Sequence, residues 1–155
     1  MLTTKKKSVK VGKLVTTEHV NNIIENYKQE RWAHSSKRLG KEDSLSVWYS
    51  VEELEEFLEK IKSHGGEGVR IYFGAYDKDY SEKPLYAGRQ TVVLVATKQK
   101  ETATGETNKD LYITTEKGTT ILAYNLGSMC PPWCGGGGGI GITIVDKGDE
   151  GMIIA

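Results

Sequence analysis

The sequence predicts an α+β domain in which two N-terminal helices pack on a mainly antiparallel sheet of about five or six strands. Helical periodicity is concentrated in the first part of the chain, and strand patterns follow it. At 155 residues the chain fits one domain, so we interpret residues 1–155 as a single unit. Its expected parts are a basic arm or edge strand over 1–16, a helical part over 17–66, and a β-rich part over 68–155 with a Cys- and Gly-rich loop over 128–139.

The first helix is expected from about residue 17 to residue 33. Thr17 suits the N-cap position, and Glu18 places a negative charge in the first turn, where it complements the helix dipole. The residues that recur at helical spacing are Val20, Ile23, Ile24, Tyr27 and Arg31. The segment 35–46 is charged and aperiodic, which indicates a connecting loop.

The second helix has the clearest boundaries in the sequence. Ser50 and Glu53 have the spacing of a capping box, and Tyr49 and Leu54 match a hydrophobic staple. The glycine pair at 65–66 provides a stop. One apolar stripe is formed by Val51, Leu54, Phe57, Leu58 and Ile61. We expect this helix to cover the strand that follows it.

Two runs carry the strongest strand signals. In Gly68–Tyr76, apolar residues alternate with others, so Val69, Ile71 and Phe73 should lie under the helix. Arg70, Tyr72 and Tyr76 should share the opposite face. The continuous β-branched run Thr91–Thr97 is typical of a strand covered on both faces, and we take it as the central strand.

The remaining strands are predicted from shorter patterns. Residues 98–110 indicate an exposed hairpin extension, and residues 116–118 indicate a turn. Further strands are expected at 111–113, beside the central strand, and at 119–126, 140–145 and 152–154. The glycine run 135–139 satisfies a G-x-G-x-x-G pattern by default, but it precedes a β-rich segment, so we expect a flexible loop and no phosphate site.

Charge and hydropathy exclude several classes of protein. Lys and Arg together number 21, as do Asp and Glu, so no global field favours nucleic acid. The lysine-rich start at 5–7 is expected to be a solvated tail. No apolar stretch is long enough to span a bilayer, and the first thirty residues lack the apolar centre of a secretory signal. We therefore expect a soluble, cytoplasmic protein with no membrane contact and no cofactor.

Cys130 and Cys134 form the most chemically specific local feature. Three residues separate them, one more than in a thioredoxin-type motif, and no helix start follows. They suit a structural turn, a local disulfide or half of a metal site. A zinc site would need two further ligands, and the only histidines are His19, His34 and His64.

The leading functional hypothesis is a non-enzymatic binding domain that recognises a small anionic ligand, a peptide or a protein. Its candidate ligand-binding residues are Arg70, Tyr72, Tyr76, Arg89 and Trp133, since arginine forks and tyrosine rings are common on binding surfaces. The alternative is a small redox or metal-binding protein that acts through Cys130 and Cys134. A purely structural role for the arginines and tyrosines stays open, and the sequence assigns no catalytic residue.

Overall fold

The structure is a computed structural model of the chain and describes residues 10–103 and 105–134. Its elements are α1 (Thr17–Tyr27), the π-helical turn η1 (Lys28–Trp32), α2 (Ala33–Leu39), β1 (Ser46–Trp48), α3 (Val51–Ser63), β2 (Gly68–Ala75), the 3-10 turn η2 (Pro84–Tyr86), β3 (Gln90–Thr102), β4 (Gly105–Asp110), β5 (Tyr112–Thr115), β6 (Gly118–Ile121), β7 (Ala123–Tyr124) and β8 (Ser128–Cys130). The predictions for the lysines at 5–7, the glycines at 135–139 and the strands at 140–145 and 152–154 lie outside the described residues.

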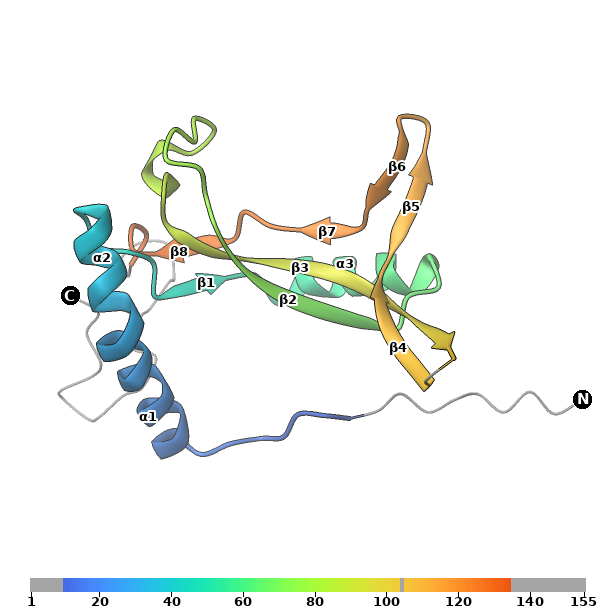
Figure 1. Cartoon of the computed structure of the whole chain (residues 1–155), viewed down its shortest axis with the longest axis horizontal. Helices are drawn as coiled ribbons and strands as arrows, with labels where there is room; N and C mark the ends of the chain where they lie inside the picture. Colours follow the sequence, from blue (N-terminus) through green and yellow to red (C-terminus); the bar gives the residue numbers. More distant parts are fainter. Residues whose placement is uncertain (1–9, 104, 135–155) are drawn as a thin grey trace, which may run out of the picture.

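The α+β class is confirmed, and every strand pair in the described part of the chain is antiparallel. Strand β3 is central as predicted, because it pairs with β2, β4 and β7 (Figure 1). The single sheet of five or six strands is not matched. The described strands instead form this four-stranded sheet and two separate pairs, β1–β8 and β5–β6. Leu111 donates to the Ala96 carbonyl oxygen of β3, but β5 then pairs with β6 alone among the described strands, so this hairpin leaves the sheet.

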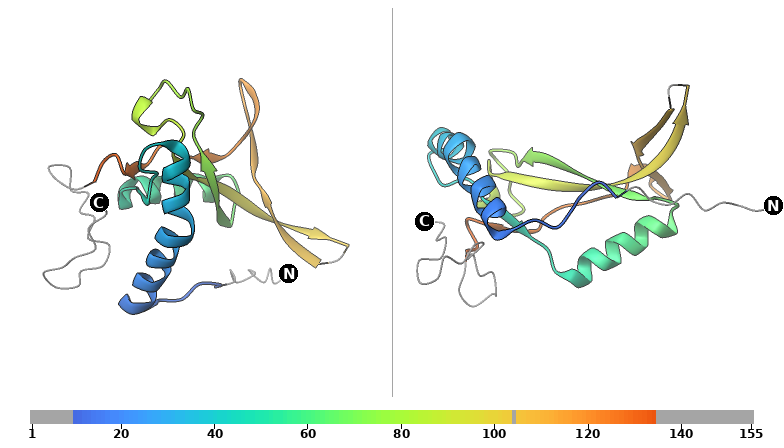
Figure 2. Two further views of the ribbon diagram at one scale, coloured as in Figure 1. Left: turned by 60° about the vertical axis from the view of Figure 1, so that its left-hand side comes forward. Right: turned by 90° about the horizontal axis from the view of Figure 1, so that it is seen from below.

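Helix α3 supplies the helical side of the core. Phe57 and Ile61 are buried in one cluster with Leu94 and Ala96 of β3 and Leu122, which lies between β6 and β7. The ring of Phe57 also lies 5.3 Å from that of Tyr124 on β7. Figure 2 shows α3 along one face of the sheet. The core is therefore the space between α3 and the middle of β3.

The first helical region does not share this core. Helices α1 and α2 run continuously through the π-helical turn and contain no buried residue. The region lies at one end of the sheet, where the Tyr27 hydroxyl donates to Gln90 Oε1 at 2.6 Å (Figures 1 and 2). The expectation of two helices packed on the sheet therefore holds for α3 alone.

The boundaries of the first helical region also differ from the prediction. The N-cap is Thr16 rather than Thr17, and its Oγ1 accepts a hydrogen bond from the backbone N–H of His19 at 3.2 Å. The helix continues to Leu39 and so includes the first five residues of the predicted loop 35–46. It ends at Gly40, whose φ of 72° is a left-handed conformation that glycine adopts without steric cost.

The exposed half of β2 corrects a second expectation. Val69 packs against the core, but Ile71 is 57% exposed and Phe73 is 83% exposed. The reason is the direction of α3, because its buried residues lie against β3 and β7 rather than along β2. The predicted cover of this face by the helix is therefore wrong beyond Val69.

The capping box of α3 is confirmed and extends to the sheet. The backbone N–H and hydroxyl of Ser50 donate to Glu53 Oε2 at 2.7 and 2.8 Å, and Ser50 Oγ accepts from the backbone N–H of Glu53. The Tyr124 hydroxyl donates to Glu53 Oε1 at 2.8 Å. The hydrogen bonds from the Ser50 backbone, the Ser50 hydroxyl and Tyr124 lower the pKa of Glu53 below its ordinary value of 4.5.

This lowered pKa predicts a pH dependence of folding. A carboxylate whose folded pKa lies below its unfolded value stabilises the fold above the unfolded pKa, and the stabilisation is lost as pH falls through the folded pKa. We expect Glu53→Gln to destabilise the protein at about pH 7, and we expect the gap to wild type to shrink below about pH 4. Urea denaturation of both proteins across this range measures it. An equal gap at every pH would show that the charge of Glu53 plays no part.

Candidate functional site

The residues predicted to bind a ligand do not form one cluster. Arg70 and Tyr72 lie together on β2, Tyr76 follows β2, and Arg89 precedes β3. In the register of β2 and β3, Arg70 pairs with Val95, six positions after Arg89, a separation of about 20 Å along the strand. The two arginines therefore lie near opposite ends of the ladder.

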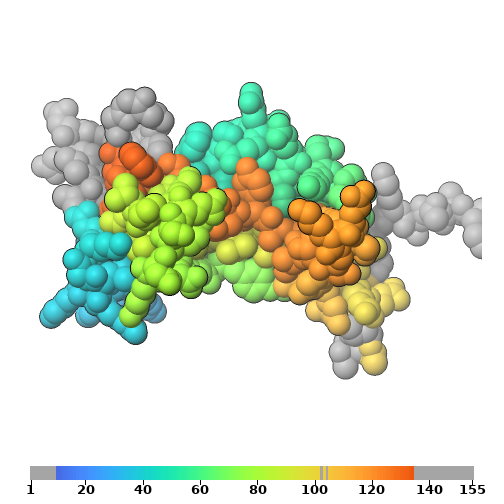
Figure 3. All heavy atoms as spheres, turned by 90° about the horizontal axis from the view of Figure 1, so that it is seen from above, coloured from blue at the N-terminus to red at the C-terminus, as the bar shows by residue number. Residues whose placement is uncertain are grey.

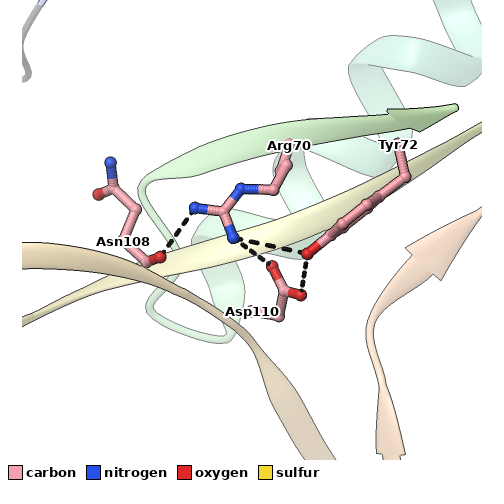
Figure 4. A network of polar contacts seen from close by, with 4 residues as sticks. All are labelled: Arg70, Tyr72, Asn108 and Asp110. Atoms are coloured by element: carbon pink, nitrogen blue, oxygen red, sulfur yellow. Dashed lines mark hydrogen bonds and ion pairs between the residues drawn. The ribbon is translucent and has the colours of Figure 1, made fainter.

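Arg70 is held by groups of the protein itself (Figure 4). Its Nη1 lies 3.2 Å from Asp110 Oδ1, and its Nη2 donates to the Asn108 carbonyl oxygen at 2.9 Å. The Tyr72 hydroxyl donates to Asp110 Oδ2 at 2.5 Å. These contacts join β2 to β4 across β3. Because the carboxylate of Asp110 already balances the guanidinium, an anionic ligand would have to displace it.

Tyr76 belongs to a different, aromatic group. Its ring stacks on that of Tyr80 with centroids 4.8 Å apart, and it lies 5.6 Å from the ring of Tyr86. Its hydroxyl donates to Asn125 Oδ1 at 3.0 Å and accepts from Thr91 Oγ1 at 3.3 Å. Tyr76 thus packs under the loop between β2 and β3, with its hydroxyl bonded at the rim.

Arg89 has a structural position. Only 8% of the residue is exposed, and its Nε donates to the Glu42 carbonyl oxygen at 2.8 Å. Its Nη1 donates to the Leu85 carbonyl oxygen. Both acceptors belong to the backbone of neighbouring loops, so Arg89 ties the segment before β1 to the turn η2.

Trp133 lies at a cavity of about 580 Å³, which is within the size range of small-molecule sites. Turn η2 and the segment around β8 are in contact there, because the Tyr86 hydroxyl donates to the Gly127 carbonyl oxygen at 3.1 Å. Figure 3 shows these two parts of the chain side by side. The lining residues used below are Trp48, Glu53, Glu82, Lys83, Tyr86, Leu126 and Trp133.

The cavity presents two tryptophans to solvent. Trp48 is 50% exposed and Trp133 is 52% exposed. Trp48 reaches the site because β1 pairs with β8, with Trp48 opposite Ser128. Trp133 was among the predicted ligand-binding residues, whereas Trp48, in an apolar patch before the second helix, was not. No local pattern could have found Trp48, since residues about 80 apart in the chain form this pair.

Backbone geometry holds the cavity wall in place. Leu126 has a φ of 69°, and a non-glycine residue in this left-handed region costs about 1–2 kcal/mol. Next to it, a Cβ on Gly127 would lie 2.5 Å from Val47 Cγ1 and 2.7 Å from Tyr49 Cζ. Strained residues that the surrounding structure holds are concentrated at ligand sites. The cavity wall at Leu126 therefore has a strained backbone, as is common at ligand sites.

A disulfide between Cys130 and Cys134 closes the turn that carries Trp133. Cys130 is fully buried, Cys134 is exposed, and the Trp133 backbone N–H donates to the Met129 carbonyl oxygen at 2.8 Å. In this state neither sulfur offers a thiolate to a metal. Within residues 10–103 and 105–134, no three His, Cys, Asp or Glu side chains are grouped as metal ligands would be.

Comparisons of the chain with protein-family models, with curated proteins and with solved structures found no match. Among the helices that the structure describes, none is long and apolar enough to cross a membrane.

Proposed function

We propose that the protein is a binding domain that takes a side chain of a peptide or protein partner, or a small molecule of that size, between Trp48 and Trp133. The observation that supports this is a cavity of ligand size with two half-exposed indole rings in its walls. Tryptophans are frequent among residues that dominate binding energy, because they bury a large area at low entropic cost. The held wall at Leu126 reduces the ordering that binding requires.

Of the predicted ligand-binding residues, this proposal retains Trp133, and it places the site away from Arg70. The guanidinium of Arg70 faces Asp110, and Arg89 is buried against backbone carbonyls. Trp48 and Trp133, by contrast, are each about half exposed. A ligand can enter the cavity without breaking an ion pair.

The redox hypothesis ranks second, supported by the disulfide and the exposure of Cys134. In an exchange, a thiolate of an incoming dithiol would attack Cys134 and release the Cys130 thiolate, and the dithiol would end as a disulfide. Cys130 is fully buried, which disfavours a charged leaving group. This exchange would therefore need movement around β8.

The test uses ¹⁵N NMR of the three indole N–H groups during titration with N-acetyl amides of Arg, Lys, Phe, Leu and Glu. We expect at least one amide to shift the signals of Trp48 and Trp133, with a dissociation constant on the order of 1 mM for one side chain. Trp32 is an internal control, because its Nε1 donates to the Asp43 carbonyl oxygen at 2.8 Å away from the cavity.

Alanine variants test whether Trp48 and Trp133 themselves bind the amide. Trp48→Ala and Trp133→Ala should each weaken the binding of the active amide at least about tenfold. Tyr112→Ala is the matched control, since this aromatic residue is 61% exposed and does not line the cavity. If no amide shifts either cavity indole, or if Tyr112→Ala weakens binding equally, the proposed function is wrong.

A further inference from the structure

The charged residues around the cavity indicate the sign of the ligand's charge. This inference rests on the proposed function. Glu53, Glu82 and Lys83 are the charged side chains that line it. In the described part of the chain, neither carboxylate forms an ion pair with a lysine or arginine. Glu53 accepts hydrogen bonds from the Tyr124 hydroxyl at 2.8 Å and from the backbone N–H and hydroxyl of Ser50 at 2.7 and 2.8 Å, and Glu82 accepts from the Tyr80 hydroxyl at 2.9 Å. These donors are neutral groups, so they orient each carboxylate without cancelling its net charge.

The aromatic walls already hold one cation. Lys83 Nζ lies 5.1 Å from the centroid of the Tyr86 ring, within the range of a cation–π contact. Indole is a better host for a cation than phenol, and the two indoles of the cavity are half-exposed. The cavity thus combines two half-exposed tryptophans with two carboxylates that form no ion pair among the described residues.

We propose that the Trp48–Trp133 cavity binds an organic cation of the alkylammonium class. The methyl or methylene groups of such a ligand would lie against the indole rings, and its charge would face Glu82 and Glu53. The same chemistry is found in a choline group and in a lysine side chain of a partner. An anion would meet two carboxylates and the single cation Lys83, which is already placed on Tyr86.

Three probes separate charge from shape in the wild-type protein: choline, its neutral isostere 3,3-dimethylbutan-1-ol, and acetate. We expect choline to shift the Trp48 and Trp133 indole signals, with the isostere at least about fivefold weaker and acetate inactive. N-acetyl-lysine amide tests the peptide source in the same way. A preference for lysine amide over choline identifies a partner side chain, and the reverse preference identifies a free or lipid-borne choline group.

Two variants test the assigned charges. Glu82→Gln should weaken choline binding about threefold to tenfold, because it removes a carboxylate at the rim. Lys83→Met should strengthen it by a similar factor, since it removes the resident cation and keeps an apolar chain over Tyr86. The exposed Glu116→Gln, in the β5–β6 turn, is the matched control and should leave binding unchanged.

The outcomes distinguish the two proposals. If the neutral isostere binds as well as choline, or if Lys83→Met abolishes binding, the cationic ligand is wrong while the binding site stands. If acetate binds and its binding depends on Lys83, the proposal of a cationic ligand is wrong, and the proposal that the cavity is a binding site stands. If choline and lysine amide leave both indoles unshifted while the phenylalanine or leucine amide shifts them, the ligand is apolar. If no probe shifts them, both proposals fail.

Discussion

Phe57→Ala is expected to lower the free energy of unfolding by about 3–5 kcal/mol, the cost of removing a buried aromatic ring and leaving a cavity. Phe57 is 5% exposed, lies at the centre of the α3–β3 core and contacts Tyr124 at 5.3 Å between ring centroids. Single domains are stable by about 5–15 kcal/mol, so the loss is a large fraction of the total. Urea denaturation followed by circular dichroism measures it.

The chain offers a matched control, because it contains only one other phenylalanine. Phe73 is 83% exposed on β2, so Phe73→Ala should change the free energy of unfolding by less than about 0.5 kcal/mol. The sequence pattern alone predicted the opposite for Phe73, with α3 above it. Equal losses from the two substitutions would show that α3 covers β2 as well as β3.

Asp43→Ala is expected to cost about 2–4 kcal/mol, because it leaves one buried and one partly buried backbone donor without an acceptor. Asp43 is 3% exposed, and its Oδ1 accepts from the backbone N–H groups of Ser44 at 2.8 Å and Gln90 at 2.7 Å. Its own backbone also accepts from Trp32 and donates to Ser36. The side chain therefore joins the segment before β1 to the start of β3. Chemical denaturation measures the loss.

Asp43→Asn separates the contribution of the hydrogen-bond acceptor at Asp43 from that of its negative charge. The amide oxygen of asparagine can accept both backbone hydrogen bonds, so this variant should lose less than half as much stability as Asp43→Ala. The ¹⁵N signal of the Trp32 indole adds a local readout, since its Nε1 donates to the Asp43 carbonyl oxygen. Equal losses from Asn and Ala would assign the effect to the negative charge instead.

Local features of the fold could be predicted from the sequence. The capping box at Ser50 and Glu53 depends on a spacing of three residues, and the β-branched run of β3 identifies a strand by composition. The α+β class follows from the order of these patterns. Such features depend on neighbours in the chain, so a single sequence contains the necessary information.

The sequence could not predict how the helices lie relative to the strands. Alternation in β2 marks two faces correctly, but it does not say how far α3 follows the strand, so Ile71 and Phe73 were placed under the helix. The periodicity of α1 likewise indicates an apolar stripe and says nothing of what meets it; no residue there is buried.

Some residues of the candidate site could be predicted from the sequence, and others could not. Trp133 and the cysteines stand out in the sequence, and the disulfide between Cys130 and Cys134 is one of the possibilities their spacing allowed. Trp48 and Glu82 come from distant segments that the β1–β8 pairing and the Tyr86–Gly127 hydrogen bond bring to one cavity. Arg70 was singled out by composition, but its acidic partner Asp110 is supplied by the hairpin register.

The most direct test of the cavity as the binding site is a crystal structure of the protein soaked with the amide or cation that gives the largest indole shift. We predict electron density for the probe between Trp48 and Trp133, in contact with both rings. Density for the probe at Arg70 and Asp110, with the tryptophan cavity unchanged, would contradict the account and return the site to the arginine and tyrosine face of β2.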